Sequence, residues 1–241
     1  MKFRLLQARL PDDIVREEER IAFASQMDVP VADIECYDML TSELAFATVT
    51  DGCDAILVGG SGAFSVLDDE PWIHSFIDLL GHIADQGFPT FASCFGFQGM
   101  ILALGGEVIH DEPNAEVGSF VLETTQAAKN DPLFASLPAT FVAQEGHKDR
   151  AQTLPAGVTN MARSERCPFQ AIRVQDTLVY ATQFHPELTY TENRKRFGRY
   201  FDMYSKAFGK SEAESMMDAF IPSPEANGLL QAFTEIIRKQ S

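Results

Sequence analysis

The residue best suited to covalent chemistry in this sequence is Cys94, within the stretch FPTFASCFGFQGMILALGG at residues 88–106. Residues 88–92 form a short apolar run that predicts a buried strand, and residues 96–104 predict a helix followed by two glycines. Cys94 would therefore lie at the corner between strand and helix. The unpaired N–H groups and partial positive charge of a helix N-terminus stabilise a thiolate, the nucleophilic form of cysteine.

The neighbours of Cys94 are small, as a sharp turn that holds a nucleophile clear of a sheet requires. Ala92 lies two residues before the cysteine and Gly96 two residues after it. This stretch alone leaves two interpretations open. Cys94 is either an activated nucleophile or a small buried hydrophobic residue, which is the usual state of a free cysteine.

A second candidate set lies in the stretch ATQFHPELTY, where His185 and Glu187 are two residues apart at the end of a predicted strand. Positions i and i+2 of an extended chain point to the same face, so the imidazole and the carboxylate can lie side by side. A carboxylate beside a histidine fixes its tautomer and stabilises the imidazolium. Taken alone, the tripeptide HPE favours a turn with a capping glutamate. Together with Cys94 it forms a nucleophile, a base and an orienting group.

The elements that would position these residues alternate between short apolar strands and amphipathic helices. The predicted strands cover residues 2–6, 34–37, 54–58 and 88–92, and the predicted helices cover residues 13–26, 41–48, 70–87 and 96–104. This alternation predicts an α/β fold, a three-layer sandwich with a mostly parallel central sheet and helices on both faces.

From about residue 107 to residue 187 the pattern changes to strands and turns. The predicted strands cover residues 107–110, 119–123, 140–143, 170–174 and 177–183. The last two would form a hairpin around a turn at Gln175 and Asp176.

The remainder of the chain predicts a helical tail. Ser211 and Glu214 form a capping-box pattern, and Ser223 before Pro224 predicts the start of a last helix. An aromatic stripe at helical spacing predicts a packing face and consists of Phe197, Tyr200, Phe201, Tyr204 and Phe208. We therefore expect one domain over residues 1–190 and a helical extension over residues 191–241 that packs on it.

The composition restricts the class of partner. The 241 residues carry a net charge of −16, which repels nucleic-acid backbones and anionic lipid, so we expect neither a nucleic-acid nor a membrane partner. No apolar run approaches the roughly 18 residues of a membrane helix, and no signal peptide is evident. The four cysteines have no metal-binding spacing, so we expect no metal and a cytoplasmic protein with reduced thiols.

The motifs around these candidates resemble those of the class I glutamine amidotransferases. ASCFGFQ (residues 92–98) is similar to the family's G-x-C-x-G-x-Q pattern, with alanine in place of the first glycine, and FHPE follows about ninety residues later. LVGGSGAFSV (57–66) resembles the family's oxyanion loop, and GHKDRAQTLPAG (146–157) resembles its H-x-D…LP-x-G segment. The resemblance covers residues 50–190, and the tail resembles free-standing members related to the amidotransferase domain of GMP synthase. It implies a flavodoxin-like sandwich.

The resemblance also implies a reaction. Cys94 would attack the side-chain amide of glutamine to form a γ-glutamyl thioester and release ammonia. His185 would accept the thiol proton and deliver one to the leaving nitrogen, and Glu187 would orient His185. Water would then hydrolyse the thioester. No cofactor takes part in this scheme.

Further residues carried over from the family would bind the substrate. The backbone N–H groups near Gly60 and of Phe95 are the expected oxyanion donors, and Gly62 would let the backbone approach the substrate. Gln98 matches the glutamine that contacts the amino-acid end of the substrate. His147 borders the pocket in relatives but is equally compatible with a surface loop.

Three functions remain open on the sequence alone. The first is glutamine hydrolysis, with any ammonia acceptor on a separate synthetase, because the chain has no P-loop and no room for a synthetase domain. The second is a γ-glutamyl peptidase acting on glutathione-like peptides. The third is a catalytically silent binding or regulatory protein, against which the presence of all three candidate catalytic residues argues.

Overall fold

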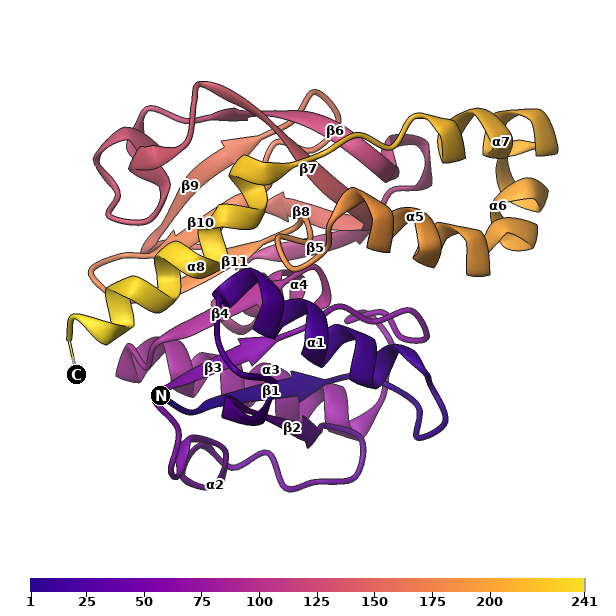
Figure 1. Ribbon diagram of the computed structural model, residues 1–241. Coiled ribbons are helices and arrows are strands. Elements are labelled where there is room, and N and C mark those ends of the chain that lie inside the picture. Colours follow the sequence, from indigo (N-terminus) through magenta and orange to yellow (C-terminus); the bar gives the residue numbers. More distant parts are fainter. Residues whose placement is uncertain (241) are drawn as a thin grey trace.

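The computed structural model describes residues 1–240, without the side chains of Met203, Ala207 and Phe208. Its central feature is a nine-stranded sheet, shown in Figure 1. The strands of this sheet are β1 (Phe3–Gln7), β2 (Ile34–Asp38), β3 (Ala55–Val58), β4 (Thr90–Ser93), β6 (Glu116–Thr124), β7 (Thr140–His147), β9 (Val158–Arg163), β10 (Ala171–Val174) and β11 (Val179–Thr182). A small second sheet pairs β5 (Glu107–His110) with β8 (Asp149–Thr153).

The order of strands in the large sheet is β2-β1-β3-β4-β11-β10-β9-β6-β7. The first five are mutually parallel, and each later pair is antiparallel. In the parallel part Val58 pairs with Ala92, and Ser93 pairs with Thr182. The carboxyl ends of β3, β4 and β11 therefore lie together at one edge, where open α/β sheets bind their ligands.

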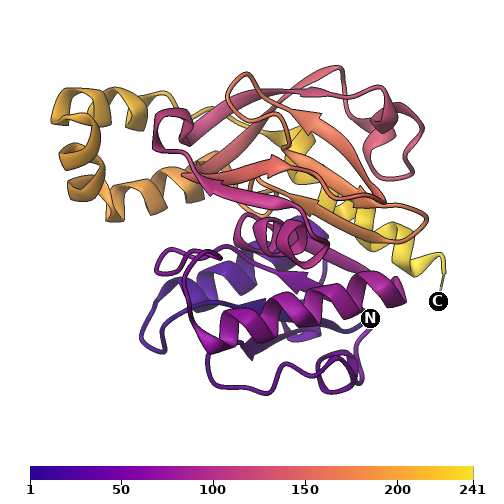
Figure 2. The same ribbon diagram turned by 180° about the vertical axis from the view of Figure 1, so that it is seen from behind.

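Helices cover both faces of the sheet, as Figures 1 and 2 show from opposite sides. The helices are α1 (Val15–Met27), α2 (Phe46–Thr50), α3 (Pro71–Gln86), α4 (Phe95–Ala103), α5 (Tyr190–Arg199), α6 (Phe201–Phe208), α7 (Lys210–Asp218) and α8 (Pro224–Arg238). Short 3₁₀ helices occupy residues 31–33, 112–114, 127–130 and 134–136. One core, which includes Phe23, Phe91 and Phe233, lies under α1 and α8, and a second, which includes Phe76 and Phe95, lies under α3 and α4.

The helices α5, α6 and α7 form a separate projection beside β6 at one end of the molecule (Figure 1). Phe197 is buried at its centre and stacks on Tyr204 with ring centroids 4.4 Å apart. The chain then returns along the large sheet, so that α8 lies next to α1. The division into residues 1–190 and 191–241 stays a prediction.

The predicted three-layer α/β fold is confirmed, including the hairpin of β10 and β11 with Asp176 at a φ of 59° in its turn. The helix expected at residues 41–48 is wrong, because only Phe46–Thr50 is helical. The capping box expected at Ser211 is also wrong. Gly209, at a φ of 92°, begins α7, so Ser211 already lies inside that helix. Phe208 lies outside the described side chains.

Two further differences concern elements that had no prediction. The strands β8 and β9 lie in a polar stretch without an apolar run. A capping box does occur at the start of α5, where Thr189 and Glu192 exchange hydrogen bonds. Within residues 1–240 no helix has both the length and the apolar character needed to cross a bilayer.

Candidate active site

Cys94 forms the corner between β4, which ends at Ser93, and α4, which begins at Phe95. Its φ of 51° and ψ of −99° are unusual for a residue with a side chain, as in nucleophile elbows. Two hydrogen bonds hold this conformation, since the Cys94 N–H donates to the Thr182 carbonyl at 2.8 Å and the Gln98 N–H donates to the Cys94 carbonyl at 3.0 Å. The strained backbone therefore belongs to the cysteine itself.

The corner depends on small neighbours. A Cβ atom at Gly96 would lie 2.7 Å from Val58 Cγ1 and 2.9 Å from the Ala92 Cβ, so this position accepts only glycine without rearrangement. Ala92 lies within regular β4 and is not among the residues with positive φ. Alanine is therefore compatible with the corner, although the family pattern has glycine there.

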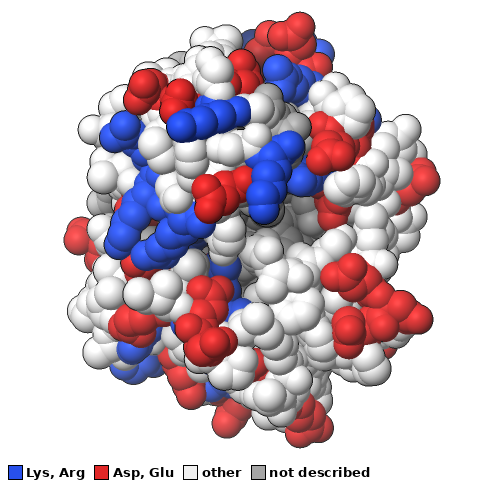
Figure 3. All heavy atoms as spheres, turned by 90° about the vertical axis from the view of Figure 1, so that its right-hand side faces the viewer, with Lys and Arg blue, Asp and Glu red and all other residues white. Residues whose placement is uncertain are grey.

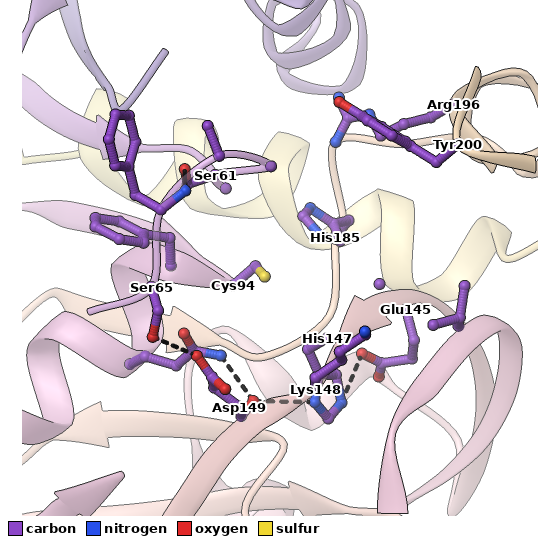
Figure 4. A pocket seen from close by; sticks show the side chains of 18 of the residues that line it. Ser61, Ser65, Cys94, Glu145, His147, Lys148, Asp149, His185, Arg196 and Tyr200 are labelled. Atoms are coloured by element: carbon purple, nitrogen blue, oxygen red, sulfur yellow. Dashed lines mark hydrogen bonds and ion pairs between the residues drawn. The ribbon is translucent and has the colours of Figure 1, made fainter. Parts of the chain in front are cut away.

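His185 follows β11, and its N–H donates to the Gln144 carbonyl at 2.9 Å. Its imidazole Nδ1 lies 2.7 Å from Glu187 Oε1. Both side chains are buried, and Figure 4 shows His185 on the same cavity into which the Cys94 sulfur points. The strand order thus brings a cysteine and a histidine from distant parts of the chain to one place.

The electrostatics of His185 favour its charged form. Burial by itself would lower the pKa of His185, but the charges of Glu187 and Cys94, with hydrogen bonds to both side chains, raise it to about 9. Burial would raise the pKa of Glu187, but His185 and the charge of Arg196 hold it below its usual value. The histidine is therefore an imidazolium near neutral pH, paired with an ionised glutamate, and lies within hydrogen-bonding reach of the thiol.

The loop after β3 passes close to both groups. A Cβ atom at Gly60 would lie 2.8 Å from His185 Cε1 and 3.6 Å from Cys94 Cβ, so glycine at this position is required for the imidazole to sit where it does. A Cβ atom at Gly62 would lie 3.0 Å from Tyr200 Oη. The assignment of oxyanion donors to this loop and to Phe95 stays a prediction.

Asp149 connects this loop to the rest of the site (Figure 4). Its carboxylate accepts a hydrogen bond from Ser65 Oγ at 2.5 Å and lies 2.7 Å from His110 Nδ1. Its carbonyl accepts a hydrogen bond from Gln98 Nε2 at 2.8 Å and lies 3.1 Å from His147 Nδ1. Asp149 therefore links the loop after β3, the strand β5 and the helix α4 around the cavity.

Two of the residues predicted to bind substrate are occupied by protein contacts. The Gln98 amide also donates to Gln183 Oε1 at 3.3 Å, so its contact with substrate stays a prediction. His147 is buried on β7, and its Nε2 lies 3.1 Å from Glu116 Oε2. The surface-loop interpretation of His147 is therefore wrong, because β7 continues past Ala143 and ends at His147 itself.

Ligand-type side chains gather next to His147. One coordinating atom from each of Glu116, His147 and Cys167 lies within 4.8 Å of the others, and all three residues are buried. Glu116 Oε2 already accepts a hydrogen bond from Gln170 Nε2 at 2.5 Å, and burial raises the pKa of the Cys167 thiol to about 12. A metal here would have to break these hydrogen bonds and deprotonate an unreactive thiol.

A cavity of about 630 Å³ opens beside Cys94 and His185. It is also lined by residues that the sequence analysis did not identify as functional, namely Arg9, His110, Glu145, Asn193, Arg196, Tyr200 and Tyr204. Three residues of the aromatic stripe line the cavity, namely Phe197, Tyr200 and Tyr204, so that stripe is only partly a packing face. Its helical spacing was visible in the sequence, but the direction in which α5 faces was not.

Glu145 has the most unusual environment of these residues. It is fully buried on β7, and neither of its carboxylate oxygens makes a hydrogen bond within the described part of the chain. His147 Nε2 lies 3.5 Å from Glu145 Oε2. Burial, followed by the charges of Glu116 and Cys94, raises the pKa of Glu145 well above its usual value. The surroundings therefore favour the protonated form of this carboxyl group.

Replacing Glu145 with glutamine is expected to stabilise the fold increasingly as the pH rises above about 4.5. In the unfolded chain the carboxyl ionises near that pH, whereas in the folded chain its raised pKa favours the protonated form, so the native protein loses stability as the pH rises. Glutamine does not ionise and avoids this loss. We expect a gain of roughly 1–3 kcal/mol near neutral pH, measured by urea unfolding across pH.

The matched control is Glu107→Gln, which changes an exposed carboxylate on β5. This variant should show no pH-dependent gain. Parallel stability curves for the native protein and Glu145→Gln would contradict the raised pKa of Glu145.

Comparisons with known proteins identify the family of this chain and its fold. The family model described as glutamine amidotransferase class-I matches residues 26–202. Among curated proteins, the GMP synthase (glutamine-hydrolyzing) of Thermosipho africanus is 34% identical over 137 residues, which are 57% of this chain and 25% of that protein. The corresponding enzyme of Psychromonas ingrahamii is 35% identical over 131 residues, 51% of this chain and 24% of that protein. The matches thus span about a quarter of the length of these relatives.

Solved structures show the same fold at low sequence identity. A glutamine amidotransferase from Thermotoga maritima has a TM-score of 0.69 at 19% identity, covering 98% of this chain and 97% of that one. A glutamine amidotransferase from Methylobacillus flagellatus has a TM-score of 0.65 at 20% identity, covering 99% and 94%.

Proposed function

The chain belongs to the class I glutamine amidotransferase family, and we propose that it hydrolyses the γ-glutamyl amide of glutamine to glutamate and ammonia. The observation that carries this proposal is the arrangement of three groups. Cys94 stands at a strained strand-to-helix corner, and His185 interacts with both Cys94 and Glu187. A nucleophile, a base and an orienting carboxylate in this order perform acyl transfer on several unrelated folds.

The reaction would proceed in two halves. The Cys94 thiolate attacks the γ-carbonyl carbon, and His185 delivers its proton to the amide nitrogen as the C–N bond breaks and ammonia leaves. The γ-glutamyl group is then held as a thioester on Cys94. Water attacks this thioester while His185 accepts a proton, and glutamate and the free thiol form. Glu187 keeps the imidazole oriented and stabilises its charge in both halves.

The oxyanion that forms in each half requires hydrogen-bond donors. We assign this role to the backbone N–H groups at Gly60 and Phe95, because both residues line the cavity next to Cys94. Phe95 is the first residue of α4, where backbone N–H groups have no partner within the helix. Each such donor contributes about 3–4 kcal/mol to the transition state.

The ammonia released in the first half would pass to an acceptor. The curated relatives are named as glutamine-hydrolysing GMP synthases, and this chain matches only about a quarter of their length. Because these relatives are named as synthases, we propose a synthetase or other acceptor protein as the partner. A cytoplasmic location would keep the Cys94 thiol reduced.

A second candidate function is supported by the size of the cavity. Its volume of about 630 Å³ is typical of sites for drug-sized ligands and exceeds what an amino acid as small as glutamine fills. A γ-glutamyl peptide would be cleaved by the same thioester chemistry, with an amino acid or peptide leaving in place of ammonia.

A substrate panel tests these proposals. Purified protein is incubated with glutamine and with γ-glutamyl dipeptides, and ammonia, glutamate and released amino acid are measured. A glutamine-mimicking electrophile is then added and the adduct is located by mass spectrometry. We expect turnover and one adduct, on Cys94. Labelling shared equally with Cys36, which is an exposed thiol, would count against an activated nucleophile. Absence of turnover with every substrate would favour the catalytically silent alternative.

A further inference from the structure

The inside of the cavity carries one positive charge that the protein leaves unpaired. Arg196 lines the cavity from α5, and within the described part of the chain its guanidinium makes neither a hydrogen bond nor an ion pair. The other basic residues of α5 are all paired. Arg194 contacts Asp218, and Lys195 and Arg199 both contact Glu18. Arg196 therefore differs from the other basic residues of α5, each of which has an acidic partner.

An unpaired guanidinium inside a cavity has a cost in free energy. Burial, and then the nearby charge of Arg9, lowers the pKa of Arg196, while the charges of Glu19 and Glu187 oppose this shift without contacting the guanidinium. Guanidinium groups in partly dry surroundings are normally held by carboxylates, because a cation without a partner forfeits its hydration. Arg9 follows this rule, since it pairs with Glu19 at 2.8 Å. A cavity that keeps Arg196 unpaired is suited to a ligand that brings the missing anion.

Neighbouring groups complete a polar pocket around Arg196. Tyr200 lies one helical turn further on, and Figure 4 shows both side chains together on the far side of His185 from His147 and Asp149. The Tyr200 hydroxyl and Arg9 Nη1 lie 3.0 and 3.8 Å from the position of a Cβ atom at Gly62. A guanidinium and a hydroxyl facing one space are a recognised means of binding a carboxylate.

The surface agrees with an anionic ligand. The protein carries a net charge of −16, which by itself would repel anions. Figure 3, which views the molecule from the end that carries α5 to α7, shows Lys and Arg side chains among Asp and Glu side chains around a hollow. The basic residues that line the cavity are Arg9, Lys148 and Arg196. The lining also contains the acidic residues Asp68, Glu145 and Asp149, so the anion-binding character of the cavity is confined to the neighbourhood of Arg196.

The position of Arg196 relative to His185 indicates which part of a substrate it would meet. His185 protonates the leaving nitrogen, so any substituent on that nitrogen lies on the His185 side of the scissile bond. Arg196 and Tyr200 lie beyond His185 on that side (Figure 4). The γ-glutamyl portion must instead reach from Cys94 toward the other end of the cavity.

We propose that Arg196, assisted by Tyr200, binds a carboxylate on the leaving group, so that the preferred substrates are γ-glutamyl amino acids. The inference rests on the proposed thioester chemistry and specifies its substrate class. The C–S bond to Cys94 forms as the C–N bond to the leaving amino acid breaks, and His185 supplies the proton for its amino group. Water then hydrolyses the thioester, so no oxidant or other co-reactant is needed.

The test compares γ-glutamyl-alanine with γ-glutamyl-ethylamide, whose leaving group is alanine without its carboxylate. We expect the native protein to favour γ-glutamyl-alanine roughly 10- to 100-fold in kcat/KM, as for a hydrogen-bonded charge pair. In Arg196→Gln this ratio should fall close to one. Arg196→Lys, which keeps the charge but loses the planar fork, should give an intermediate ratio and provides a second variant if the first is unstable. Arg199→Gln, on the same helix and paired with Glu18, should keep the native ratio.

The outcomes separate this inference from the proposed function. Absence of turnover with glutamine and with both γ-glutamyl compounds would reject the hydrolase itself. Turnover without preference for the carboxylate in the native protein would reject the Arg196 subsite alone. An equal loss in Arg196→Gln for γ-glutamyl-alanine, γ-glutamyl-ethylamide and glutamine, with KM raised for each, would place the guanidinium on the γ-glutamyl carboxylate and also reject the leaving-group subsite.

Discussion

Replacing Cys94 with serine is expected to lower kcat/KM for the best γ-glutamyl substrate by roughly 10⁴-fold or more. The hydroxyl of serine remains protonated where a thiol beside an imidazolium can ionise, and the weaker nucleophile cannot form the thioester. The fold should tolerate the change, because Cys94 is small and its backbone is held by hydrogen bonds to Thr182 and Gln98. Coupled detection of glutamate measures the loss, and thermal unfolding verifies that the variant is folded.

The control for this variant is Cys36→Ser. Cys36 is exposed on β2, remote from the edge where Cys94 lies, and its replacement should leave kcat/KM within about twofold of the native value. Turnover by Cys94→Ser at close to the native rate would mean that another group attacks the substrate, and the thioester mechanism would then be wrong.

The nucleophile could be found from the sequence because its signal is local. The apolar strand, the small residues around Cys94 and the following helix occur within one short stretch, and the corner they predict carries a φ of 51° at the cysteine. The pairing of His185 with Glu187 is also local, since two residues of an extended segment share a face. The sequence analysis combined the two sets by their chemistry, whereas their proximity in space depends on the pairing of β4 with β11.

The environment of the site could not be predicted in the same way. Glu145 is fully buried because β7 runs on to His147, whereas the sequence indicated a strand only as far as Ala143. Arg196 stands between basic residues that point outward, and nothing in the segment NRKRF distinguishes the inward one. Both features depend on how an element is rotated against distant parts of the chain. Glu145 and Arg196 also have polar atoms or a charge without a partner. Predictions from local sequence patterns fail most often at such residues.

The charge of Glu187 is expected to control both activity and the pH dependence of stability. Glu187→Gln should lower kcat by roughly 10²- to 10⁴-fold, because the amide no longer stabilises the imidazolium and can favour the wrong tautomer of His185. It should also lower the pKa of His185 from its value of about 9, since the charge of Glu187 is the main influence that raises it. Nuclear magnetic resonance titration of the His185 ring measures this change directly.

The sign of the stability change follows from the same pKa. His185 ionises near 6.5 in the unfolded chain and near 9 in the folded one, so the native fold binds an additional proton between these values. The contribution of His185 to the stability of the fold is complete below about pH 6.5 and is lost as the pH rises through about 9. Glu187→Gln should flatten this decline or move it to lower pH, whereas Glu235→Gln, at an exposed position on α8, should not. An unchanged decline in Glu187→Gln would mean that Glu187 does not hold the proton on His185, and its role as the orienting group of the triad would fall with it.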